Sequence, residues 1–121
     1  MTRSYDDLAA AQRALHETEQ RLLALLPAVG PAKADIEYDG ERKKMALAEA
    51  VKVVRSASPT SAQGAAESEA RTLPSYKTEI QELYIRFSKA CYVDAAWRLG
   101  IAQVEIGRSS VSVEKTLAGM Q

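Results

Sequence analysis

The chain has 121 residues, which corresponds to about one domain, and 46% of its residues are hydrophobic. Its 16 basic and 16 acidic residues give a formal net charge of zero, which argues against an acidic mimic of DNA and against a strongly basic nucleic-acid coat. Few residues are aromatic and alanine is common, so the composition favours thin, closely packed helices in a single domain over residues 1–121.

The compartment is indicated by the cysteine content and the N-terminal residues. Cys91 has no second cysteine for an intramolecular disulfide, which favours a reduced, intracellular setting. The first residues lack the apolar run of a signal peptide, and no stretch reaches the roughly 18–20 apolar residues of a membrane span. We expect a cytoplasmic protein without a membrane contact.

The first predicted helix covers residues 5–28. Ser4 and Asp7 have the spacing of a capping box at its start, with Asp where Glu is more usual. Pro27 and the Gly30–Pro31 pair predict that it ends between residues 26 and 30. Large residues recur every seven positions, with a second set three positions later, which is typical of a coiled-coil seam. The seam consists of Leu8, Leu15, Leu22 and Val29, with Ala11, Thr18 and Leu25.

The second predicted helix covers residues 41–57, although its start is open. Asp39 is its N-cap if Asp39–Gly40 forms a turn. Alternatively, the helix begins near residue 33 and tolerates Gly40 at a cost of about 1 kcal/mol. Small polar residues and a proline then predict a loop over residues 56–61.

A short helix over residues 62–72 and a long helix over residues 75–106 complete the prediction, followed by a tail over 107–121. The long helix shows alternating spacings of three and four residues, and would span about 48 Å at 1.5 Å per residue. Its seam consists of Tyr76, Ile80, Leu83, Phe87, Ala90, Asp94, Trp97, Ile101 and Val104. We therefore predict an all-α fold, an elongated helical hairpin or coiled-coil-like bundle with one long C-terminal helix, and expect a homo-oligomer.

Asp94 interrupts this apolar seam, and a buried carboxylate requires a partner or water. Arg98 follows at the i+4 spacing of a helical ion pair, and a partner on another helix is the alternative. We interpret Asp94 as a structural residue.

The sequence contains no motif that is typical of a catalytic site. One histidine and one cysteine provide no zinc ligand set with the usual spacing. The scattered glycines form neither a phosphate-binding loop nor a nucleophile elbow. We expect a protein that is not an enzyme and holds no metal or cofactor.

Two groups of residues are candidates for binding an anion or nucleic acid. For the first group, interspersed acidic residues favour a solvated, salt-bridged surface over a binding site. For the second group, the alternative to a binding site is a C-terminal cap and tail. The first group is Arg42, Lys43, Lys44, Lys52 and Arg55, and the second is Arg108, Ser109, Ser112 and Lys115.

Residues 33–116 contain a series of short motifs in a particular order. The motifs are Glu41–Lys44, Ala65–Glu67, Tyr76–Lys77, and then Arg108, Ser109, Ser112, Glu114 and Lys115. In this order they resemble small helical proteins that tailed bacteriophages encode, often near single-strand annealing and recombination genes. The resemblance implies a phage or prophage protein of the early region that acts in the bacterial cytoplasm.

Two functions follow as hypotheses. The first is an accessory protein of phage DNA recombination and early metabolism that binds a recombination protein, with single-stranded DNA as a further contact. The alternative is an inhibitor of bacterial anti-phage defence that blocks a CRISPR-type nuclease complex or sequesters a nucleotide signal.

Overall fold

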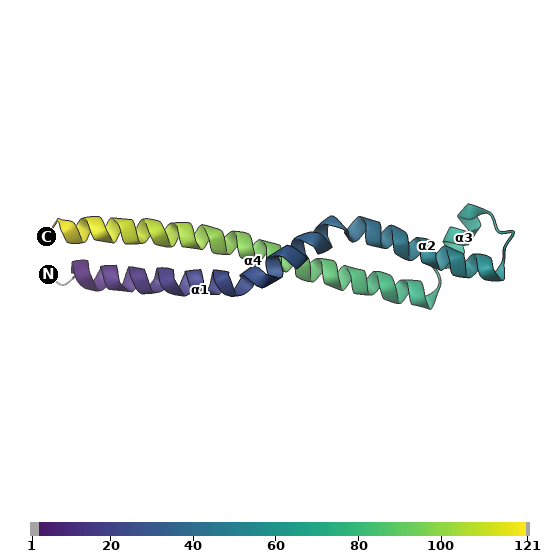
Figure 1. The fold of residues 1–121 in the computed structure, drawn as a ribbon, viewed down its shortest axis with the longest axis horizontal. Coiled ribbons are helices and arrows are strands. Elements are labelled where there is room, and N and C mark those ends of the chain that lie inside the picture. Colours follow the sequence, from purple (N-terminus) through teal and green to yellow (C-terminus); the bar gives the residue numbers. More distant parts are fainter. Residues whose placement is uncertain (1–2, 121) are drawn as a thin grey trace. The chain divides into compact units, whose positions relative to one another are not determined.

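The computed structural model describes residues 3–120, and every regular element in this range is an α-helix (Figure 1). The helices are α1 (Arg3–Glu37), α2 (Asp39–Ala57), α3 (Gln63–Ala70) and α4 (Pro74–Gly119). The predicted all-α class and the long C-terminal helix are confirmed. The capping box at the first helix involves Ser4, whose side chain lies outside the described part of the chain.

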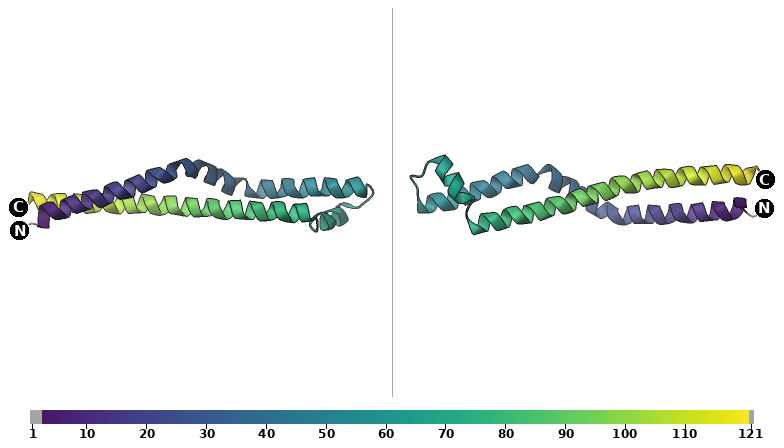
Figure 2. Two further views of the ribbon diagram at one scale, coloured as in Figure 1. Left: turned by 90° about the horizontal axis from the view of Figure 1, so that it is seen from below. Right: turned by 180° about the vertical axis from the view of Figure 1, so that it is seen from behind.

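The helices form two compact units, and α1 and α4 contribute to both. The terminal unit combines the described parts of Met1–Gly30 and Tyr92–Gln121, and the central unit is Pro31–Cys91. In the terminal unit, the N-terminal part of α1 lies antiparallel beside the C-terminal part of α4 (Figures 1 and 2). The expectation of a single domain stays a prediction.

Leucines of α1 pack onto glycines of α4 in the terminal unit. Leu22 Cδ1 lies 2.6 Å from the point that a Cβ at Gly100 would occupy, and Leu15 Cδ1 lies 3.0 Å from the corresponding point at Gly107. A step of seven residues along α1 thus matches a step of seven residues back along α4, which defines one antiparallel register. The missing side chains create the space that each leucine fills, so α4 of the same chain is a helical partner of the predicted Leu15–Leu22 seam.

α1 continues through both of its prolines, so the predicted end between residues 26 and 30 is wrong. Pro27 and Pro31 each lack an N–H donor, and the carbonyl groups that lose a partner belong to Leu23 and Pro27. Both residues are exposed, so water can bind these two oxygens. Val29, between the prolines, is buried, and its packing stabilises the helix here.

α4 continues through residues 107–119, so the predicted helix end at residue 106 and the tail after it are wrong. Gly107 lowers helix propensity by about 1 kcal/mol relative to alanine, which is a local reason for a helix to end here. Its contact with Leu15 and the burial of Val104 and Val111 on either side favour the helix instead. Tertiary packing therefore outweighs local propensity in this segment.

The core of the central unit lies between α2 and α3. Its buried residues are Ala50, Val51, Val54, Ala66 and Ala70, and the half-buried Leu47, Leu73 and Tyr76 pack against them. Alanines on α3 allow this short helix to approach α2 closely.

The starts and ends of α2 and α3 differ slightly from the prediction. α2 begins at Asp39, and its N-cap is Tyr38 rather than Asp39. Backbone hydrogen bonds of 2.9 Å from Tyr38 N to Ala34 O and from Arg42 N to Tyr38 O keep the chain helical on both sides of this residue. The predicted loop follows α2, and α3 is two residues shorter at its C-terminal end than the predicted 62–72.

Candidate functional site

A groove of about 610 Å³ runs along α2 and the start of α3. Its apolar lining comes from Leu47, Ala48 and Val51 of α2. Its polar lining comprises Lys44, Lys52, Arg55, Ser56, Gln63 and Glu67. The groove thus combines an apolar floor with a polar rim in which positive charge predominates.

Helical spacing explains why these side chains meet. Lys44, Ala48, Val51 and Arg55 are separated by four, three and four residues, which places them on one face of α2. The short loop after α2 then returns the chain so that α3 lies beside this face (Figure 1). A basic and apolar stripe on one helix consequently becomes the wall of a groove.

A polar network at the α3 side of the groove orients Arg55. Arg55 Nη2 donates a hydrogen bond to Gln63 Oε1, and Gln63 Nε2 donates to Glu67 Oε1 over 2.8 Å. The neutral Gln63 amide thus positions the guanidinium without neutralising its charge. Arg55 can still pair with a carboxylate of a bound molecule.

Among the described residues, the ion pairs of the two rim lysines are with neighbours on α2 itself. Lys44 Nζ lies 3.3 Å from Glu41 Oε1, and Lys52 Nζ lies 3.3 Å from Glu49 Oε1. All four side chains are mostly exposed, and exposed pairs of this kind contribute about 0–1 kcal/mol. Both ammonium groups can therefore exchange these partners for an anionic group in the groove at little cost.

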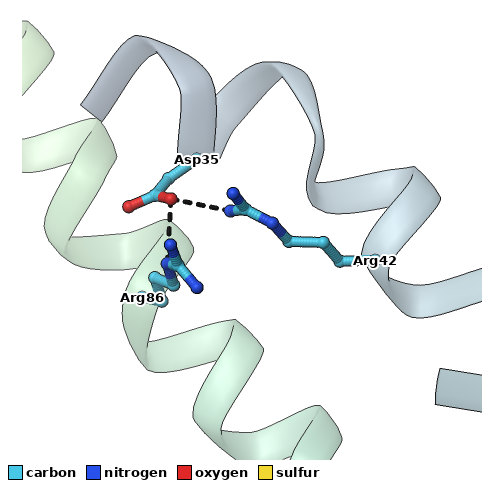
Figure 3. Close-up of polar contacts among 3 residues, drawn as sticks. All are labelled: Asp35, Arg42 and Arg86. Atoms are coloured by element: carbon cyan, nitrogen blue, oxygen red, sulfur yellow. Dashed lines mark hydrogen bonds and ion pairs between the residues drawn. The ribbon is translucent and has the colours of Figure 1, made fainter. Parts of the chain in front are cut away.

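Arg42 belongs to a different cluster in the central unit. Arg42 Nη1 lies 2.6 Å from Asp35 Oδ1, and Arg86 Nε of α4 lies 2.8 Å from the same oxygen (Figure 3). The hydrogen bond from Arg42 and the positive charge of Arg86 together hold the pKa of Asp35 below its usual value, although partial desolvation opposes them. This cluster joins α1, α2 and α4 within the central unit.

Lys43 is also occupied within the central unit. Its Nζ lies 2.9 Å from Asp39 Oδ2 and 6.0 Å from the centre of the Phe87 ring. The structure therefore separates the first basic group predicted from the sequence. Lys44, Lys52 and Arg55 line the groove, whereas Arg42 and Lys43 make intramolecular contacts.

The second predicted group lies on α4 in the terminal unit rather than in a tail. Arg108, Ser112 and Lys115 are spaced by four and three residues, so they share one face of the helix. Ser109 lies on another face and lines a separate groove with Ile106. The helix thus divides this group between two surfaces.

The residues of the predicted packing seams are half-buried or buried, with one exception. Ile101 is exposed, because the row of α4 that faces α1 passes through Gly100 and Val104. Asp94 makes the expected pair, since its Oδ2 lies 3.1 Å from Arg98 Nε. The half-buried residues include Leu8, Leu15, Leu22, Tyr76, Ile80, Leu83, Phe87, Asp94 and Trp97, and the buried ones are Val29, Ala90 and Val104.

Two features are absent from the described part of the chain. Among residues 3–120, no helix is both long and apolar enough to cross a membrane. The same residues contain no group of three or more His, Cys, Asp and Glu side chains arranged to hold a metal ion.

Comparison of the chain with models of protein families, with curated proteins and with solved structures finds no match.

Proposed function

We propose that this chain is a non-enzymatic interaction protein that binds an acidic, amphipathic helix of a partner protein in the groove between α2 and α3. The observation that carries the proposal is the apolar floor of the groove beneath a rim of Lys44, Lys52 and Arg55. An amphipathic helix inserts its apolar face into such a floor, and acidic residues flanking that face pair with the cations. Rim charges of this kind select the partner and accelerate its association.

The lining favours a protein segment over single-stranded DNA. Proteins that bind single strands combine cations with aromatic side chains on which the bases stack. The floor of this groove is instead formed by Leu47, Ala48 and Val51, and no aromatic residue contributes to the lining. Glu67 on the rim would also repel a continuous phosphate backbone.

The biological setting we propose is phage DNA recombination and early metabolism in the bacterial cytoplasm. Its support is the resemblance of residues 33–116 to small helical phage proteins, and this range includes the whole groove. The partner would then be a recombination protein with an acidic helix. No feature of the groove favours the alternative of a defence inhibitor.

A titration followed by fluorescence anisotropy tests the groove directly. The probe is a labelled synthetic amphipathic helix with leucines on one face and glutamates on the other. The double variant Lys52→Glu/Arg55→Glu is expected to weaken its binding at least about tenfold, because two attractive contacts become repulsive. Lys89→Glu makes the same kind of charge change on an exposed part of α4, outside the groove, and should leave binding unchanged.

Two further probes separate the possible partners. A peptide with lysines in place of the glutamates should bind more weakly than the acidic peptide, and a labelled oligothymidine should also bind more weakly. Equal binding of the acidic peptide by the double variant would refute the proposed site. Tighter binding of oligothymidine, with the steep salt dependence of phosphate contacts, would show that the groove serves nucleic acid instead.

A further inference from the structure

A row of large apolar side chains lies exposed along α4, and at the residue directly after it, in the terminal unit. We call these five residues the α4 stripe: Tyr92, Leu99, Ile106, Val113 and Met120. They recur at intervals of seven residues and are between 57% and 77% exposed. Monomeric proteins rarely leave such a contiguous apolar surface uncovered, and a seven-residue repeat is the pattern that another helix covers.

The terminal unit has little apolar core of its own. Within its described residues, the buried apolar side chains are Val29, Val104 and Val111. Two antiparallel helices bury only one seam, and the larger side chains of the α4 stripe remain outside it. A helix that covers the stripe would bury five large apolar side chains, in addition to the three valines that this unit buries by itself.

The surface of α4 beside the stripe is shaped to receive side chains from a facing helix. Small residues follow each of the first four stripe residues after three positions, and all are exposed: Ala95, Ala102, Ser109 and Thr116. A groove of about 520 Å³ is present at the middle of these two rows. Its lining includes Ala102, Glu105, Ile106 and Ser109, the spacing of the four residues that form one hole in a coiled coil.

We propose that a second copy of this chain covers the α4 stripe, with the two α4 helices antiparallel and Ile106 of each copy near the twofold axis. Because α4 carries a large row and a small row side by side, an antiparallel pair places each stripe against the small row of the other copy. A parallel pair would instead place large against large and small against small. The hairpin itself uses the same complementarity, since Leu15 and Leu22 pack onto Gly107 and Gly100.

The size of this surface fits a stable dimer. The stripe extends over about 42 Å at 1.5 Å per residue. Together with the small row it offers on the order of 600 Å² per copy, at the lower end of the roughly 600–1,000 Å² that each partner contributes to a standard interface. Matching each stripe to the small row of the other copy pairs Ile106 with Ser109, which centres the antiparallel pair midway between these two residues. Such a self-complementary surface is what a twofold interface requires.

Sedimentation equilibrium of the full chain tests this interface. We expect a dimer for the unaltered chain. Ile106→Glu should raise the dissociation constant about 1,000-fold. Loss of one buried hot-spot residue weakens affinity about 30-fold, and the twofold symmetry places this residue in the interface once from each copy. Val53→Glu alters a similarly exposed apolar residue on α2 and should leave the dimer intact. A monomeric unaltered chain, or a dimer that persists in Ile106→Glu, would overturn the proposal.

Crosslinking tests the direction of the helices without disturbing the fold. In a Cys91→Ser background, a short bismaleimide should join a Leu99→Cys copy to a Val113→Cys copy. Leu99→Cys alone should crosslink poorly, because the two copies of this residue would lie about 26 Å apart along antiparallel helices. Efficient crosslinking of Leu99→Cys to itself would overturn the antiparallel arrangement. Neither experiment uses the groove between α2 and α3, so the outcome is independent of the proposed function.

Discussion

Gly100 lies against Leu22 in the terminal unit, and alanine in its place is expected to destabilise the fold. A Cβ at this position would lie 2.6 Å from Leu22 Cδ1, about 1 Å inside ordinary van der Waals contact. Adding a methyl group to a packed contact costs about 1–3 kcal/mol. Alanine recovers about 1 kcal/mol through its higher helix propensity. The free energy of unfolding should therefore fall by about 1 kcal/mol.

Gly40→Ala is the matched control, since a Cβ there would have no atom within 4 Å. This variant should gain up to about 1 kcal/mol from helix propensity. Urea denaturation followed by far-ultraviolet circular dichroism measures both effects, at one protein concentration because association changes apparent stability. Leu22→Ala should lower the free energy of unfolding by about 1 kcal/mol less in the Gly100→Ala chain than in the unaltered chain, because the shortened side chain no longer meets the added methyl group. Equal stabilisation by Gly100→Ala and Gly40→Ala would refute the proposed packing.

Two other substitutions test the central unit and the path of α1. Asp35→Asn removes both ion pairs of Asp35 and should lower the free energy of unfolding by about 1–2 kcal/mol at neutral pH, a value reduced because Arg86 is half exposed. Because the folded state lowers the pKa of Asp35, its contribution is complete above the ordinary carboxyl pKa of about 3.9 and is lost as the pH falls through the lowered value. Denaturation as a function of pH should show the two chains converging below about pH 4, and a constant difference would contradict this cause. Pro27→Ala restores a donor for the Leu23 carbonyl oxygen and should raise the free energy of unfolding by about 1–2 kcal/mol; a thermal melt without any gain would show that α1 needs this proline.

The periodicity of the sequence predicted the helices and one face of each, but not their partners. Leu15 and Leu22 were recognisable as a seam from their spacing. Their contacts, Gly100 and Gly107, are the residue type that normally weakens a helix, and the predicted helix ended at residue 106, directly before the second of these packing sites. Only the antiparallel register of α1 and α4 in the terminal unit distinguishes a glycine that ends a helix from a glycine that receives a leucine.

The α4 stripe was missed for the same reason. Once residues after 106 are assigned to a tail, Val113 and Met120 no longer belong to the repeat that begins at Tyr92. The seven-residue interval from Tyr92 to Met120 was nevertheless present in the sequence, and a helix continued through Gly107 would have shown it.

Local spacing was sufficient for some polar contacts and insufficient for others. Asp94 and Arg98 form the pair expected from their i,i+4 spacing. Asp35 was not identified, although Arg42 follows it after two helical turns, because the Arg86 contact comes from a distant part of the chain. Likewise, the five basic residues of α2 looked equivalent until the positions of Asp35, Phe87 and α3 separated them.

Hydrogen–deuterium exchange of the full chain, with and without the acidic amphipathic peptide, tests the proposed function most directly. A peptide bound in the groove buries the facing sides of α2 and α3 and stabilises their backbone hydrogen bonds. We expect exchange to slow across residues 44–67, which contain the whole lining, and to remain unchanged in the N-terminal part of α1. Slowed exchange elsewhere with no change across residues 44–67 would contradict the assignment of this groove as the binding site.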